Sequence, residues 1–231
     1  MTSPTTLEGI ARRVVRCTRC PRLRDHCETV AREKRPMYRD WSYWGKPVPG
    51  FGDPAARLLI VGLAPAAHGA NRTGRMFTGD RSGEFLHAAL HRTGFANQAE
   101  AVSRGDGLTL NGAYITAAVR CAPPENQPTL EEQEACRPFL DQERSLLSEV
   151  RAVLALGKIG HDTYLRYLKA KGFEVTLAAF PFAHGAEHAL PDGARLFDSF
   201  HPSQQNTFTG KLRPADLDRV LRAARRFAGL R

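Results

Sequence analysis

The chain has 231 residues, 42% of them apolar, which is enough to bury a core within one domain, 1–231. Lysine and arginine together exceed aspartate and glutamate by nine, a balance that favours a polyanionic partner such as nucleic acid over an acidic surface. No apolar run approaches the roughly 20 residues that span a bilayer, and the N-terminus lacks the pattern of a signal peptide. We therefore expect a cytoplasmic monomer with no membrane partner.

Residues 1–56 differ in character from the rest of the chain. They contain two helical stretches, a C-x-x-C pair between them at Cys17 and Cys20, and an irregular aromatic segment at 41–45. This pattern predicts an N-terminal helical extension that packs on the main fold and is tied to it by a metal centre.

From residue 58 onward, short apolar runs alternate with helical patterns. The alternation predicts an α/β fold, a three-layer αβα sandwich around a mostly parallel four-stranded sheet. The expected strands are 58–61, 113–119, 152–156 and 195–200, and the expected helices are 82–93, 129–149, 159–169 and 214–228.

Unusual segments follow each expected strand. They are 62–65, 120–124, 157–158 and 201–203, all rich in glycine, proline, cysteine or histidine. Because ligands of such folds collect at the carboxyl ends of the strands, the sequence predicts a binding site at this edge of the sheet.

Four cysteines stand in a pattern typical of a metal centre: Cys17 and Cys20, then Cys121 and Cys136 about a hundred residues later. Thiols stay reduced in the cytoplasm, so a metal is favoured over disulfides. Four thiolates fit tetrahedral zinc or an iron–sulfur cluster, and the spacing does not choose between them. The alternative is that they are core residues. The fifth, Cys27, is interpreted as a buried thiol.

The segment 62–80 is long and rich in small residues, and we expect it to be non-helical. Phe77 offers a flat face on which a base can stack, and Asp80, just before a helix, can accept a proton or orient water. The alternatives are a core aromatic and a helix-start carboxylate. Asn71, Arg72 and Arg75 are candidates for phosphate contacts, or face only solvent.

His201 follows the last expected strand and would point into the cleft, where it can donate a hydrogen bond to a leaving base. A lone histidine is more often structural. The polar loop after it can enter a DNA groove, with Ser203 and Lys211 among the contacts. His68, His161, His184 and His188 show no shared metal-site spacing, and we interpret 184–188 as a loop feature.

Together, the segments 62–80, 119–126 and 200–203 and the four cysteines resemble the family-5 uracil-DNA glycosylases, the UDGb type of bacteria and archaea. The resemblance extends from Cys17 to about Leu212. It implies the uracil-DNA glycosylase fold and a structural [4Fe–4S] cluster held by Cys17, Cys20, Cys121 and Cys136.

The resemblance also implies an activity. It is hydrolysis of the N-glycosidic bond of uracil, and of other deaminated bases such as hypoxanthine and xanthine, in double-stranded DNA, leaving an abasic site. Asp80 and Asn126 match residues that position water, and His201 matches the histidine of the third motif. Phe77 matches the stacking aromatic, and the amides of Gly62, Leu63 and Ala64 would help His201 to stabilise charge on the base.

One position departs from the related family-4 pattern. Ala117 stands where those enzymes carry a uracil-reading asparagine, which fits the UDGb type and a less selective pocket. Two other classes remain as alternatives: a non-catalytic DNA-binding protein stapled by zinc or an iron–sulfur cluster, and a redox iron–sulfur protein whose basic face recruits an acidic partner.

Overall fold

A computed structural model describes residues 6–230, and its centre is a sheet of six strands in the order β1-β3-β2-β4-β6-β5. The four inner strands are parallel, whereas β1 and β5 run antiparallel along the two edges. The strands are β1 Phe51–Gly52, β2 Leu58–Gly62, β3 Ala113–Ala117, β4 Ala152–Leu156, β5 Glu187–Ala189 and β6 Arg195–Ser199.

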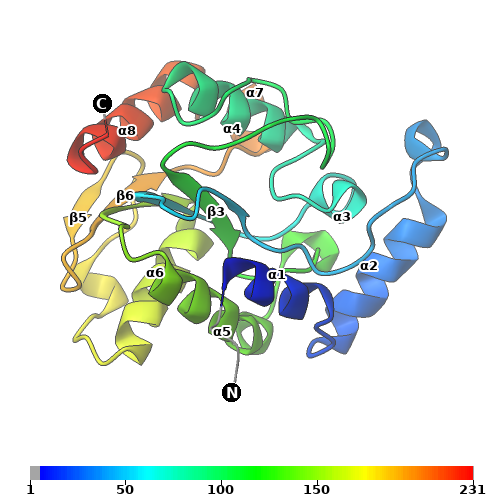
Figure 1. The fold of residues 1–231 in the computed structure, drawn as a ribbon, viewed down its shortest axis with the longest axis horizontal. Helices are drawn as coiled ribbons and strands as arrows, with labels where there is room; N and C mark the ends of the chain where they lie inside the picture. The colour runs from blue at the N-terminus through cyan, green and yellow to red at the C-terminus, as the bar shows by residue number, and fades with distance from the viewer. Residues whose placement is uncertain (1–5, 231) are drawn as a thin grey trace.

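Helices cover both faces of this sheet, as the predicted sandwich requires (Figure 1). The helices are α1 Leu7–Val15, α2 Pro21–Glu33, α3 Ala70–Thr73, α4 Arg81–Arg92, α5 Leu130–Leu146, α6 Lys158–Ala170, α7 Gln204–Phe208 and α8 Pro214–Phe227, with short 3-10 turns η1 Pro36–Tyr38, η2 Pro124–Asn126 and η3 Leu177–Ala179. Helices α4 and α8 lie on one face, and α5 and α6 on the other.

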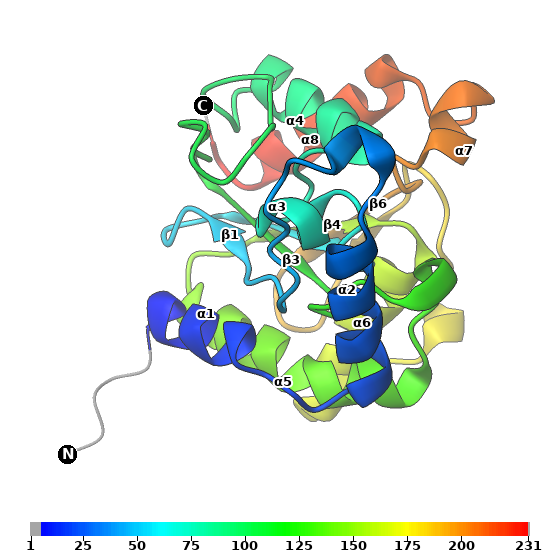
Figure 2. The ribbon, with the colours of Figure 1, turned by 90° about the vertical axis from the view of Figure 1, so that its right-hand side faces the viewer.

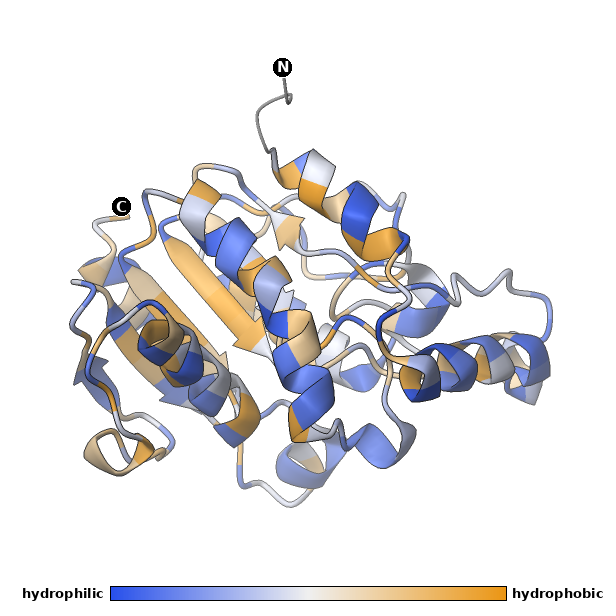
Figure 3. Cartoon of the chain, turned by 90° about the horizontal axis from the view of Figure 1, so that it is seen from below, coloured by the Kyte–Doolittle hydropathy of each residue, from blue (hydrophilic) through white to orange (hydrophobic). Residues whose placement is uncertain are grey.

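Strands β2, β3 and β4 are buried along their whole length, because helices exclude water from both sides. Strand β6 is buried except at Arg195. One core cluster joins Ile60, Ile115 and Leu154 to α4 and α8, and a second joins Val61 and Val153 to α5 and α6. Figure 3 shows the strands coloured mostly hydrophobic, whereas the helices carry both colours.

The N-terminal extension packs on this sandwich through its two helices (Figure 2). Helix α1 lies along α5, where Ile10 and Val14 contact Phe139, and α2 contacts α3. The two predicted helical stretches and the turn between them are therefore present. Among the described residues, no helix is both long and apolar enough to cross a membrane.

The sequence interpretation missed four elements. The edge strands β1 and β5 are two and three residues long and partly exposed, so they leave no apolar run to detect. The segment 62–80, expected to be non-helical, contains α3, and the polar loop after His201 contains α7. Glu187 and His188, interpreted as part of a loop, belong to β5.

Candidate active site

Asp80 is held in place by the helix that follows it. Its backbone is extended, and its Oδ1 atom accepts a hydrogen bond of 2.9 Å from the Gly83 amide, which makes it the N-cap of α4. The other oxygen lies against Gly69, where a Cβ atom would stand only 1.7 Å from Oδ2. Burial raises the pKa of Asp80 above its usual value, although the amides of Gly83 and Ser82 oppose that shift. Asp80 can therefore both cap α4 and orient water, because capping uses only one of its two oxygens.

Phe77 lies where β2 and β6 end. A Cβ atom on Gly62 would stand 2.8 Å from the Phe77 ring, so the ring covers the end of β2 only because that residue is glycine. The Phe77 ring faces the His201 ring, with centroids 5.9 Å apart and planes inclined by 34°. Phe77 itself is 8% exposed and has a left-handed backbone with φ of 49°. Such a conformation is uncommon for a bulky residue and fixes the direction of the ring.

His201 begins the segment after β6 and is partly buried. Gly157, at the end of β4, gives it room, since a Cβ atom there would lie 3.2 Å from the His201 Cβ. Burial lowers the pKa of His201 to about 4. The imidazole is therefore neutral at neutral pH, with one nitrogen that donates and one that accepts hydrogen bonds.

The ends of β2 and β3 are locked together beside Phe77. Gly62 pairs in register with Ala117, and the carbonyls of Gly62 and Leu63 accept hydrogen bonds from Ala118 (3.0 Å) and Val119 (3.2 Å). These residues thus lie side by side at the strand ends, as the sequence predicts. The partly buried Ala64 packs nearby, against a buried cluster that contains Val119 and Cys121.

Asn126 differs from these residues in that its side chain is exposed. It lies on η2, where both it and Glu125 have left-handed backbones, with φ of 58° and 54°. Within residues 6–230, no hydrogen bond engages its side chain. Its role in positioning water stays a prediction.

Three residues expected to contact DNA are instead inside the protein. Asn71, Arg72 and Arg75 are 0%, 4% and 4% exposed, respectively. The Asn71 amide donates a hydrogen bond to the Cys27 carbonyl (3.2 Å) and so links α3 to α2. The burial of all three does not agree with the expected phosphate contacts.

The two arginines hold the loop together. The Arg72 guanidinium lies between the rings of Tyr38 and Trp41, at 3.9 Å and 4.0 Å, and donates to the carbonyls of His68 and Gly79. Arg75 makes a two-pronged ion pair with Asp106, at 2.8 Å and 2.7 Å. Tyr38, Trp41 and Asp106 are distant from the loop in sequence, which is why the composition of the loop did not reveal these partners.

The segment after His201 lies at the surface. Ser203 caps α7 through its hydroxyl, which accepts a hydrogen bond from the Asn206 amide. The exposed Lys211 places its ammonium 4.5 Å from the centre of the Phe200 ring. At the end of α7, Phe208 is 74% exposed, a feature that the sequence interpretation did not single out. DNA contact by Ser203 and Lys211 stays a prediction.

The four predicted ligand cysteines, Cys17, Cys20, Cys121 and Cys136, line one pocket. Cys17 and Cys20 come from the turn before α2, Cys121 follows β3, and Cys136 lies on α5. Cys27 is fully buried, and its sulfur accepts a hydrogen bond of 3.2 Å from the Ala122 amide, as expected for a structural thiol.

The spacing of the sulfur atoms bears on which group the pocket fits. A single zinc ion with bonds of about 2.3 Å holds its thiolates within about 3.8 Å of one another. In the described part of the chain, no three cysteines bring their sulfurs within 4.8 Å of one another. The described sulfurs are therefore not arranged as the four ligands of a single tetrahedral zinc ion.

Arg120, which also lines this pocket, indicates the charge of such a group. It is 2% exposed, and one of its nitrogens pairs with Glu143 at 2.5 Å. Its Nε and Nη1 atoms are buried without a partner. Unpaired buried donors are costly, so they favour an anionic group with acceptor atoms beside the cysteines.

Comparison with known sequences agrees with this geometry. Residues 49–225 match the model of the uracil DNA glycosylase superfamily. The chain belongs to this superfamily. It is 52% identical over 215 residues to the Type-5 uracil-DNA glycosylase of Mycobacterium leprae, covering 93% of this chain and 92% of the relative. The enzyme of the same name from Thermus thermophilus is 48% identical over 223 residues, 96% of this chain and 99% of the relative.

The Type-5 relatives match a larger share of the chain than the Type-4 relatives do. The Type-4 uracil-DNA glycosylase of Pyrobaculum aerophilum is 38% identical over 128 residues, 55% of this chain and 56% of the relative. The Type-5 relative from the same organism is 47% identical over 222 residues, 96% of this chain and 93% of the relative. The resemblance to the family-5 enzymes is thereby confirmed.

Proposed function

We propose that the protein is a DNA repair hydrolase that cleaves the N-glycosidic bond of uracil in DNA and leaves an abasic site. The observation that carries this proposal is the grouping of Phe77 against Gly62 and His201 where β2 and β6 end. This reaction needs an aromatic face, a neutral imidazole and a fixed carboxylate. Phe77 offers the first, His201 the second, and Asp80, three residues after Phe77, the third. The superfamily match and the names of the relatives support it.

His201 acts on the base. Cleavage leaves negative charge on the departing uracil and positive charge on the sugar. A neutral imidazole donates one hydrogen bond to the base carbonyl whose charge grows, and Phe77 supplies a stacking face for the ring. Because burial holds the pKa of His201 near 4, the donor stays neutral and does not repel the cationic sugar.

Asp80 acts on water. With Oδ1 occupied by the Gly83 amide, the second oxygen is the one that can orient a water molecule toward the sugar carbon. As an anion it also stabilises the developing positive charge. Asn126 is the second candidate for holding this water.

The substrate range and DNA form are finer parts of the proposal. Ala117 at the end of β3 offers no amide to read uracil, so we infer that hypoxanthine and xanthine are also accepted. Double-stranded DNA is the proposed substrate, because extruding a base from a duplex requires a wedge. We infer that the exposed Phe208 serves as this wedge and that Ser203 and Lys211 contact the flanking phosphates.

The cysteine pocket would hold a structural [4Fe–4S] cluster through Cys17, Cys20, Cys121 and Cys136. The shared pocket of the four cysteines and the unpaired donors of Arg120 support this assignment. A bound cluster would tie the turn before α2 to β3 and α5. We further propose that the chain works as one domain, 1–231, and as a cytoplasmic monomer.

Single-turnover cleavage tests the function. Duplex and single-stranded oligonucleotides carrying uracil opposite guanine, or hypoxanthine, are incubated with excess protein and treated with alkali to reveal abasic sites. Cleavage of both lesions in duplexes supports the full proposal, and cleavage of uracil alone restricts the substrate. Tight binding with intact strands leaves the non-catalytic alternative.

Substitutions of Asp80 and His201 test the role of each residue in the same assay. Asp80→Ala is expected to slow the chemical step by roughly 10²–10⁴-fold, the usual contribution of a positioned acid or base, without abolishing it. His201→Ala should slow cleavage more than it weakens DNA binding. An unchanged rate for Asp80→Ala would remove this residue from the mechanism, and loss of affinity alone would make His201 a docking residue.

A further inference from the structure

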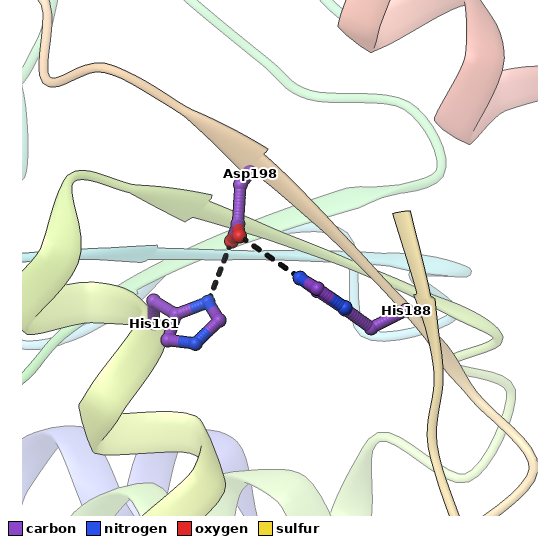
Figure 4. Close-up of side chains that lie close together, drawn as sticks. All are labelled: His161, His188 and Asp198. Atoms are coloured by element: carbon purple, nitrogen blue, oxygen red, sulfur yellow. Dashed lines mark hydrogen bonds and ion pairs between the residues drawn. The ribbon is translucent and has the colours of Figure 1, made fainter. Parts of the chain in front are cut away.

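A cluster of two histidines and one aspartate lies on the α6 side of the sheet and is not used by the proposed reaction. His161 comes from α6, His188 from β5 and Asp198 from β6, and their side chains point toward one another (Figure 4). Their ligand atoms all lie within 4.8 Å of one another. The three side chains are 1%, 14% and 0% exposed, respectively.

The protonation of His161 is fixed by a carbonyl. Its Nε2 atom lies 2.8 Å from the Phe180 carbonyl oxygen, which can only accept, so Nε2 carries the proton. In a neutral imidazole Nδ1 is then a bare lone pair, and it lies 2.8 Å from Asp198 Oδ1, another acceptor. These two acceptors are joined either by a second ring proton on Nδ1 or by a metal ion bound to both. Metal-binding histidines show this arrangement, with the remote N–H donated to a carbonyl.

A second pair of atoms distinguishes a metal ion from a proton. His188 Nε2 and Asp198 Oδ2 lie 3.4 Å apart, and both are buried without a hydrogen-bond partner. A proton shared by His161 and Asp198 would leave this pair unsatisfied, at a cost for each buried polar atom. Two ligands bound tetrahedrally to zinc at about 2.1 Å stand about 3.4 Å apart, which matches this separation. His161 Nδ1 and Asp198 Oδ1, 2.8 Å apart, would have to separate by about 0.6 Å to reach the same spacing.

We propose that His161, His188 and Asp198 form a site for a divalent transition-metal ion, with zinc the best match to two imidazoles and a carboxylate. Such ligand sets suit zinc better than magnesium or calcium, which prefer oxygen. Three protein ligands leave the fourth tetrahedral position to water. The aromatic rings of Phe180 and Phe182 border the cluster, at 5.8 Å from His188 and 5.6 Å from His161.

The position of the site defines what the ion would do. It would join the edge strand β5 to β6 and α6, at a place where β5 is short and, among the described strands, pairs with β6 alone. Asp198 lies three residues before His201, so the ion would also brace the start of the segment that carries this histidine.

Metal binding by the full-length, iron–sulfur-loaded protein tests the proposal. The protein is dialysed against buffered Zn²⁺, and zinc and iron are measured by elemental analysis. We expect one zinc ion per chain in the wild type and in the control His91→Gln, which changes an exposed histidine on α4. Asp198→Asn and His188→Gln should weaken zinc binding by more than about 100-fold, the upper range for loss of an outer partner, with iron unchanged.

Cobalt provides a readout that needs no variant. Co²⁺ bound at this site should give visible ligand-field bands without the intense near-ultraviolet band of thiolate coordination. A wild-type protein that holds no zinc or cobalt would overturn the proposal and leave a proton-bridged cluster. So would zinc retained equally by Asp198→Asn and His188→Gln, or a thiolate-type cobalt spectrum, which would place the ion at the cysteines.

Discussion

Two segments that follow strands of the sheet look alike in sequence but differ in their relation to solvent. The segment 62–80 turns inward, and Arg72 and Arg75 are 4% exposed each. The segment 201–211 turns outward and presents Phe208 at 74% exposure and an exposed Lys211. Basic residues in a glycine-rich loop are therefore no guide to DNA contact unless their partners are known.

The difference lies in what each segment has to hold. The first keeps Phe77 in a left-handed conformation and Asp80 against Gly69, and hydrogen bonds from Arg72 to loop carbonyls stabilise that shape. The second consists of one short helix capped by Ser203 and has few buried side chains. One segment builds the pocket, and we expect the other to approach the duplex.

Removing the ion pair inside the first segment should have the largest effect on stability. Arg75→Leu leaves Asp106 without its partner, although Asp106 would keep the backbone amides of Val102, Ser103 and Leu108. Breaking a buried pair from one side costs about 3 kcal/mol or more. Urea unfolding measures the loss, and the exposed Arg81→Leu serves as the control. A loss as small as that of the control would show that Arg75 does not support the loop.

The burial of histidine side chains predicts that the folded protein loses stability in acid. Burial lowers the pKa of His87, fully buried on α4, to about 4. The unfolded chain takes up the proton near pH 6.5, so the stability present above that pH is lost as the pH falls toward 4, by roughly 3 kcal/mol. His201 adds to the loss in the same window, whereas Asp80, whose pKa is raised, opposes it.

A matched pair of variants isolates the contribution of His87. His87→Leu should unfold with a smaller pH dependence between pH 6.5 and 4 than the wild type, while His91→Leu on the exposed side of α4 should not differ. Equal slopes for wild type and His87→Leu would mean that His87 is protonated in the folded protein.

Sequence reasoning recovered the elements with long periodic patterns and missed those defined by distant contacts. The four inner strands and the helices α4, α5, α6 and α8 were predicted within a few residues, because buried strands and amphipathic helices leave continuous signals. The shared pocket of the four cysteines followed from the spacing of the pairs.

The interior positions of Asn71, Arg72 and Arg75 could not be predicted in this way. Their partners include Cys27, Tyr38, Trp41 and Asp106, which come from other parts of the chain. The cluster of His161, His188 and Asp198 escaped for the same reason, since three separate elements bring it together. The C-x-x-C pair marked the cysteine pocket because Cys17 and Cys20 share one turn, whereas no two members of the histidine–aspartate cluster share an element.

In the exposed segment 201–211, Phe208→Ala is expected to change the cleavage of DNA but not the stability of the protein. Its side chain makes little contact with the protein, so stability should change by no more than about 0.5 kcal/mol. Loss of a stacking wedge should slow cleavage in duplex DNA by about tenfold while leaving single-stranded substrate nearly unaffected, because only a duplex has a gap to fill. Equal slowing on both substrates would place Phe208 in strand binding instead.

The smallest effect is expected at Lys211. Lys211→Ala should leave unfolding unchanged and weaken binding equally for lesion-containing and undamaged duplexes, because a phosphate contact carries no sequence information. The slope of log affinity against log salt should become shallower by about one, the signature of one lost phosphate contact. An unchanged slope would mean that Lys211 stays on the Phe200 ring in the complex, and the outward segment would then contact DNA through α7 alone.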